Sequence, residues 1–167
     1  MADSCIVGRH CFKIGAMSEI TVRRATNDDA SAVIGLLIAL AEYEKLTPPD
    51  LAGRARLSAE MASANPRFEA YLAESECAAI GCTIVFEVYG SFIARPKLYI
   101  EDLFVLPEYR GQGAGKALFK AMVEQARIRG CAKMEWTALN WNTSAHDFYR
   151  KIGGRRLDAL QVFQLEV

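Results

Sequence analysis

Alternating or continuous apolar runs recur along the chain from residue 20 onward and predict a series of strands. The main runs lie at 20–25, 68–74, 78–89, 98–106 and 133–139. Between them, apolar residues at helical spacing predict helices over about 26–45, 53–63, 114–129 and 142–152. The closing stretch, 155–167, is predicted to add one or two further strands.

Residues at the ends of these segments support the same division. Thr26 and Asn142 are N-cap residue types placed just before helical patterns. Asn65-Pro66 and Gly130 stand where two of the helices are expected to end. Strands follow one another in pairs instead of alternating strictly with helices, so the order predicts a mixed α/β fold.

The stretch 98–120, LYIEDLFVLPEYRGQGAGKALFK, is the most informative part of the chain. It reads as a buried strand ended by Pro107, then a loop from Arg110 to Gly115, then a helix. Glycines allow a tight turn and close approach of a ligand, while the first helical turn offers unpaired N–H donors. The sequence therefore predicts a site for phosphate or pyrophosphate, although such a loop can also be an ordinary turn.

Both common nucleotide motifs fail at this loop. The dinucleotide fingerprint needs a third glycine where Lys116 stands, and the Walker motif needs Ser or Thr where Ala117 stands. The pattern present is Arg-x-x-Gly-x-Gly, made by Arg110, Gly113 and Gly115.

Length and composition narrow the class of protein. The 167 residues, 51% of them hydrophobic, suit one domain of normal core size. The 20 basic and 20 acidic residues balance, so we expect no nucleic-acid partner. Five cysteines without a CxxC spacing predict no metal site and a reducing, cytoplasmic compartment.

The first 17 residues carry no apolar run long enough for a signal peptide or a membrane span. We expect them to be an extension, with a single domain over 18–167. Met17 precedes the first credible strand and is a candidate for the natural translation start, but an ordinary N-terminal arm explains these residues equally well.

Three stretches together resemble the GCN5-related N-acetyltransferase (GNAT) superfamily, in its spermidine/spermine (diamine) branch. They are RRATNDDA with LAEYEKL, YIEDLFVLPEYRGQGAGKALF, and NWNTSAHDFYRKIGG. The resemblance implies a mostly antiparallel central sheet with helices on both faces. It also implies acetyl-CoA as co-substrate, a homodimer, and cofactor binding by Leu103, Phe104, Val105, Arg110, Gly111, Gln112, Gly113, Ala114, Gly115, Lys116, Asn142 and Ala145.

Acetyl transfer to an amine makes three chemical demands. The ammonium must lose a proton, the thioester oxygen needs hydrogen-bond donors, and the departing thiolate benefits from an acid. The resemblance assigns Glu101 as the base, acting through water, and Tyr149 as the acid. Because strand neighbours alternate between faces, we expect only one of Glu101 and Asp102 to face the cleft. Exposed edge acids and a core tyrosine are the alternative interpretations.

The amine site implied by the resemblance contains Tyr43, Glu44, Glu101, Glu135 and Trp136. The chain departs from the family at 157–161, where an acidic-aromatic stretch is shortened, and this weakens an assignment to long polyamines. The predicted function is direct acetyl transfer, in a ternary complex, to a diamine, polyamine or lysine-like amino acid. Protein lysine or N-terminal acetylation and a non-catalytic CoA sensor are the alternatives.

Overall fold

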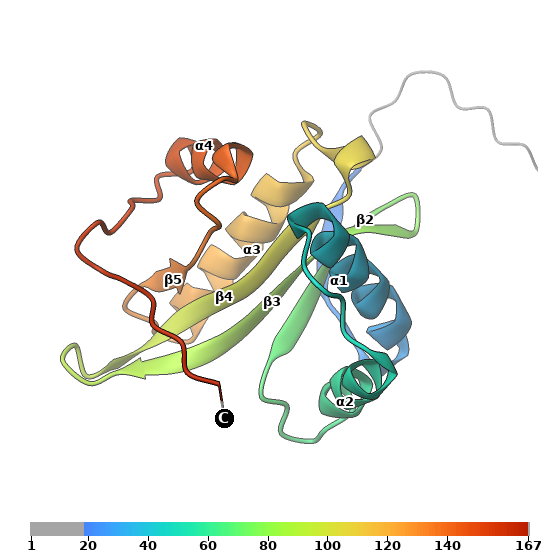
Figure 1. Cartoon of the computed structure of the whole chain (residues 1–167), viewed down its shortest axis with the longest axis horizontal. Coiled ribbons are helices and arrows are strands. Elements are labelled where there is room, and N and C mark those ends of the chain that lie inside the picture. The colour runs from blue at the N-terminus through green and yellow to red at the C-terminus, as the bar shows by residue number, and fades with distance from the viewer. Residues whose placement is uncertain (1–18, 167) are drawn as a thin grey trace, which may run out of the picture.

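A computed structural model describes residues 19–166, in which one five-stranded sheet forms the centre of the molecule (Figure 1). The strands lie side by side in the order of the sequence, and every neighbouring pair is antiparallel except the last, β4 with β5, which is parallel. Their bounds are β1 Thr21–Arg24, β2 Glu69–Ser75, β3 Ala78–Gly90, β4 Arg95–Val105 and β5 Met134–Trp136.

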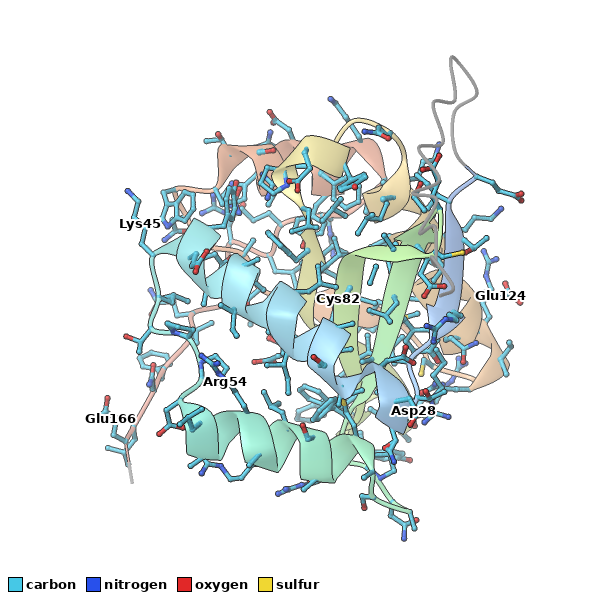
Figure 2. All side chains as sticks on the ribbon, turned by 90° about the vertical axis from the view of Figure 1, so that its right-hand side faces the viewer. Asp28, Lys45, Arg54, Cys82, Glu124 and Glu166 are labelled. Atoms are coloured by element: carbon cyan, nitrogen blue, oxygen red, sulfur yellow. The ribbon has the colours of Figure 1, made fainter. Side chains whose placement is uncertain are left out.

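Helices cover both faces of this sheet, as predicted. One face carries α1 (Ala30–Glu44) and α2 (Leu51–Met61), which lie side by side with Cys82 of the sheet behind them (Figure 2). The other face carries α3 (Ala114–Ile128), and α4 (Thr143–Lys151) packs on the same side through Phe148 and Ile152. Short 3-10 turns precede α1 and the glycine loop, at Asn27–Asp29 and Pro107–Tyr109.

Local signals explain where these helices begin and end. Thr26 and Asp29 form a reciprocal capping box before α1, with Thr26 N–H donating to the Asp29 carboxylate at 2.7 Å. Asp50 and Asn142 cap α2 and α4 by accepting from backbone N–H groups two or three residues into each helix. Gly130, with φ of 66°, follows α3.

The core divides into two layers, one on each face of the sheet. Leu118, Met122 and Ala126 of α3 pack against one face, and Val33 and Leu36 of α1 pack against the other. Each layer buries several large apolar side chains, each worth about 1.5–3 kcal/mol. The sheet between them is therefore a rigid support for whatever lies at its edge.

Two predictions about the end of the chain are wrong. The predicted strand at 133–139 forms only over Met134–Trp136, because the chain then turns away from β4. No strand forms over 155–166, whose apolar side chains are exposed and which pairs with no strand among the described residues, 19–166.

The predicted extension over 1–17, including the candidate start at Met17, lies outside the described residues, so the division of the chain stays a prediction. Between residues 19 and 166, no helix is both long and apolar enough to cross a membrane.

Candidate active site

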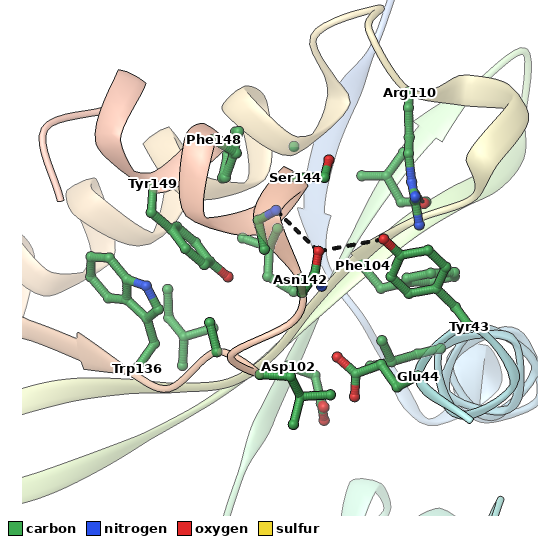
Figure 3. A pocket seen from close by; sticks show the side chains of 18 of the residues that line it. Tyr43, Glu44, Asp102, Phe104, Arg110, Trp136, Asn142, Ser144, Phe148 and Tyr149 are labelled. Atoms are coloured by element: carbon green, nitrogen blue, oxygen red, sulfur yellow. Dashed lines mark hydrogen bonds between the residues drawn. The ribbon is translucent and has the colours of Figure 1, made fainter. Parts of the chain in front are cut away.

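A cavity of about 950 Å³ opens where β4 and β5 separate. Their parallel pairing ends at Ile100 with Trp136, and beyond that point the two chain segments diverge and both line the cavity. The end of α1, the glycine loop and α4 complete its walls (Figure 3). Beyond Ile100, the backbone groups that β4 turns toward this gap have no β5 partner, so those that no side chain engages can bind a ligand.

The glycine loop forms one end of the cavity. Gly111 and Gly113 have φ of 76° and 99°, a region that other residues rarely adopt, and α3 begins at Ala114. The N–H groups of the first helical turn have no acceptor within the helix. All twelve predicted cofactor residues line the cavity except Gln112, whose side-chain amide donates to the Glu108 carbonyl at 3.2 Å.

Arg110 points from this loop across the cavity toward α1. Its Nε donates to the Val105 carbonyl at 3.0 Å, and its guanidinium lies 4.3 Å from the centre of the Tyr43 ring. The Tyr43 hydroxyl in turn donates to Asn142 Oδ1 at 3.4 Å (Figure 3), and Trp141 packs on the same ring. Side chains from α1, the glycine loop and the start of α4 therefore meet over the cavity.

The two neighbouring carboxylates of β4 both line the cavity, so the expectation that only one would do so is wrong. The pairing of β3 with β4 shifts by one residue here, with Ile84 opposite Asp102 and Val85 opposite Ile100. Glu101 is the extra residue of this bulge, which interrupts the alternation of side chains between faces. Glu101 is exposed, whereas Asp102 is half-buried.

Asp102 and Glu44 place two carboxyl groups at the end of the cavity away from the glycine loop (Figure 3). Burial, with Glu101 and Glu44 nearby, raises the pKa of Asp102 to about 6. Burial also raises the pKa of Glu44. Such a pair favours binding of a cation, since a positive charge relieves both the burial of the carboxylates and their repulsion.

Tyr149 projects from α4 into the same space (Figure 3). Its ring packs on Trp136 with centres 5.1 Å apart and on Phe148 at 5.4 Å. Burial and the negative charges of Glu44 and Asp102 raise its pKa to about 12, so the phenol keeps its proton at neutral pH. Asn142, the N-cap of α4, and Tyr149 both line the cavity.

The structure separates Glu135 from the other predicted amine-site residues. Its carboxylate accepts from Lys97 Nζ at 2.5 Å and pairs with Lys133 at 2.6 Å, and both contacts lower its pKa. It does not line the cavity, whereas Trp136 beside it does. Period-2 alternation in β5 accounts for this difference, since neighbours point to opposite faces.

Sequence reasoning missed two side chains at the site, Trp141 and Ser144. Trp141 supports the Tyr43 ring, with centres 5.9 Å apart, and Ser144 lines the cavity near Asn142 (Figure 3). The available signal was their position beside Asn142, the N-cap of α4, because residues adjacent in sequence to a site residue lie close to it in space. In the described part of the chain, no group of three or more His, Cys, Asp or Glu side chains is arranged to hold a metal.

Comparison with known proteins finds similarity to acetyltransferases at the level of both family and individual sequences. The model of the acetyltransferase (GNAT) family matches residues 36–154. A thialysine N-epsilon-acetyltransferase of Sus scrofa is 32% identical over 150 residues, covering 84% of this chain and 87% of that protein. An L-ornithine N5-acetyltransferase of Arabidopsis thaliana is 39% identical over 75 residues, covering 45% of this chain and 33% of that protein.

Solved structures share the fold. A possible acetyltransferase from Clostridium difficile 630 superposes with a TM-score of 0.77 at 17% identity, covering 89% of this chain and 97% of its own. The predicted fold class is thereby confirmed.

Proposed function

The chain belongs to the acetyltransferase (GNAT) family and is an N-acetyltransferase, and on this premise we propose that it transfers the acetyl group of acetyl-CoA to a small primary amine. The acceptor class is a diamine, a polyamine or a lysine-like amino acid. One observation carries the proposal: a single cavity joins the glycine loop at one end to Glu44, Asp102 and Tyr149 at the other. It thus offers an anion site and a cation site with a phenol beside the latter.

The residues of the first end fit coenzyme A. Positive φ at Gly111 and Gly113 opens the loop, and an added Cβ at either position would meet nothing within 4 Å. Loop and helix N–H groups suit the pyrophosphate. The β4 edge over 103–105, which has no β5 partner, suits an extended, amide-containing arm, in the manner of an added strand. The bound donor would supply the activated acetyl thioester.

The carboxylates of the other end would prepare the acceptor. Glu44 and Asp102 hold the ammonium, and Glu101, the exposed residue of the bulge, takes the proton through water. The amine nitrogen then forms a bond to the acetyl carbon as the carbon–sulfur bond breaks. Backbone N–H groups of β4 donate to the oxygen that gains negative charge. None of the described residues lining the cavity is a cysteine that could carry the acetyl group, which favours direct transfer in a ternary complex.

Tyr149 would serve the departing sulfur. A phenol with its pKa near 12 remains protonated and can donate to a thiolate. The same Glu44 and Asp102 charges that raise this pKa are neutralised by a bound ammonium, so acceptor binding makes Tyr149 a better acid. Packing against Trp136 and Phe148 fixes the direction of its hydroxyl.

We further propose that the protein is a cytoplasmic homodimer. Support comes from Leu160, Val162, Phe163 and Leu165, apolar residues close together in sequence that are 69–88% exposed. An exposed apolar strip of this kind is a contact site for a second copy. The cysteines Cys77, Cys82 and Cys131 are free thiols, as a reducing compartment favours. Light scattering that reports a monomer at micromolar concentration would contradict the dimer.

A thiol-release assay with acetyl-CoA and a panel of amines tests the activity. We expect turnover with at least one free diamine, polyamine or ω-amino acid. Turnover only with peptides would favour a protein lysine or N-terminal acetyltransferase. Tight acetyl-CoA binding, measured by calorimetry, without turnover of any amine or peptide would favour a CoA sensor. Absence of binding heat would contradict all three functions.

A further inference from the structure

A second cavity, of about 420 Å³, lies on the far side of the β4 carboxylates from the glycine loop. It is an open hollow lined by residues of α1, of α2 and of the sheet face that these two helices cover, the face seen in Figure 2. Glu101 and Asp102 line both cavities, so the two spaces meet at the carboxylates proposed to deprotonate and to bind the reacting amine. An acceptor bound at Asp102 would have the second cavity open to its remaining atoms.

The walls of this cavity change in character along its length. Past the two carboxylates they are apolar, formed by Leu37 and Leu57 from the helices and by Phe68, Ile84 and Phe86 from the sheet side. Arg67 is the basic residue among the lining groups. Its side chain is 87% exposed, which places the guanidinium at the solvent rim. The sequence thus gives this cavity an acidic end, an apolar middle and a basic rim.

Glu60 holds Arg67 in place at this rim. Its carboxylate accepts from Arg67 Nε at 2.8 Å, from Nη2 and from the Arg67 backbone N–H at 2.6 Å. The Glu60 side chain is only 13% exposed, whereas the guanidinium keeps N–H donors that face solvent. An arginine fixed by one carboxylate and open on its other edge is poised to accept a second anion.

On the basis of the proposed function, we propose that this second cavity holds the non-reacting part of the acceptor and selects ω-amino acids over diamines. Such a molecule has an ammonium for Asp102 and Glu44, an apolar stem for the middle, and a carboxylate for Arg67. A diamine of equal length would bring a second ammonium to apolar walls and a guanidinium. Desolvation and like-charge repulsion both oppose that placement. Arg67 is then a specificity-determining residue.

A matched series of acceptors tests the far end of the site. Hexylamine, 6-aminohexanoate and hexane-1,6-diamine share a six-carbon stem and one reacting amine, and they end in a neutral, an anionic and a cationic group. With kcat/KM measured by thiol release, and the diamine corrected for its two equivalent amines, we expect 6-aminohexanoate to exceed the diamine about tenfold. The preference should shrink in high salt, because the rim is exposed.

Variants of the rim assign this preference to Arg67. Arg67→Gln should reduce the ratio of 6-aminohexanoate to diamine by about threefold or more, whereas Glu60→Gln, which frees the guanidinium, should raise it. Arg127→Gln is the control, since Arg127 also forms an exposed ion pair, with Glu124, but lines neither cavity. An unchanged ratio in Arg67→Gln, or a wild-type enzyme that prefers the diamine, would overturn the inference.

A second pair of variants tests occupation of the apolar middle. Leu57→Trp should fill the cavity and lower kcat/KM for hexylamine while leaving ethylamine unaffected, because ethylamine is too short to reach it. Leu51→Trp, on the same helix but 82% exposed and outside the cavity, is the control. Equal effects on both amines would overturn the inference while leaving the proposed function intact. Failure of every amine to react would overturn both.

Discussion

The two ends of the active-site cavity are built in opposite ways. Most of the cofactor end comes from one continuous stretch, in which β4 leads through the glycine loop into α3, and the start of α4 adds Asn142 and Ala145. The acceptor end combines α1, the β4 bulge, Trp136 and α4, which are separated by as many as a hundred residues along the chain. The first end depends on local backbone geometry, and the second depends on packing that brings distant side chains together.

The ends also differ in their electrostatics. At the cofactor end, backbone N–H groups and a helix N-terminus can bind an anion. These groups belong to ordinary secondary structure, so forming them requires no burial of charge. At the acceptor end, Glu44 and Asp102 are partly buried near each other, and the pKa of both carboxyl groups is raised. The buried, mutually repelling carboxylates lower the stability of the free protein, and a bound cation would offset this electrostatic cost. The acceptor end is therefore expected to lower folding stability in return for substrate binding.

Tyr149 links the two ends, and its removal should have the largest effect. Tyr149→Phe keeps the ring that packs on Trp136 but deletes the hydroxyl. We expect kcat to fall about 10²-fold or more while KM for acetyl-CoA changes little. Steady-state kinetics measure this, with Tyr89→Phe as the control because Tyr89 is 68% exposed and outside the cavity. An unchanged kcat would remove Tyr149 from the mechanism.

At the acceptor end, Asp102→Asn should weaken amine binding, raising KM for the amine about tenfold or more. Wild-type kcat/KM should fall as pH drops below about 6, because Asp102 then becomes protonated and loses its charge. Glu101→Gln should instead lower kcat, since Glu101 is proposed to take the proton. Equal effects of the two substitutions on kcat and KM would contradict these separate roles.

The same Asp102→Asn substitution should stabilise the fold at neutral pH. The native pKa of about 6 lies above the usual value of 3.8, so the native state holds this proton more tightly than the unfolded state. Unfolding free energy therefore falls as pH rises from about 4 to 6 and stays lower above that range. Chemical denaturation should show the variant about 1–3 kcal/mol more stable at pH 7. Near pH 3.5 the difference should vanish, and a constant difference would refute the explanation.

At the cofactor end, Gly113→Ala should act through the backbone. An added Cβ meets nothing within 4 Å, but a φ of 99° is strained for alanine. We expect the dissociation constant of CoA to rise about tenfold, because relaxing the strain moves the loop. Calorimetry measures this. Gly35→Ala is the matched control in helix α1, where Cβ also meets nothing and the backbone is helical, so CoA binding should not change.

The smallest effect should come from Glu135→Gln. Because this carboxylate is engaged by Lys97 and Lys133 outside the cavity, its loss should leave KM for the amine within about twofold. Stability should fall by about 1 kcal/mol or less, as for other partly exposed ion pairs. A large rise in KM would restore Glu135 to the acceptor end as the sequence predicted.

Most of the elements follow from local pattern. The capping signals at Thr26 and Asn142 and the glycines around α3 place helix ends within a few residues of those observed. The wrong expectations concern residues whose neighbours come from elsewhere in the chain. Glu101 and Asp102 share one cavity because the register of β4 against β3 shifts at this point. The simple alternation of strand side chains between faces does not predict such a shift. Glu135 forms ion pairs with two lysines, one of which lies on β4.

The sequence alone determined the strand, loop and helix of the cofactor end and the residue types available for proton transfer, because spacing and backbone preference act over short distances. Tertiary structure alone decided which carboxylates face the amine, how far their pKa values rise, and that a second cavity with Arg67 at its rim adjoins them. These properties depend on burial and on through-space charge. Both are fixed only when segments far apart in the sequence pack together.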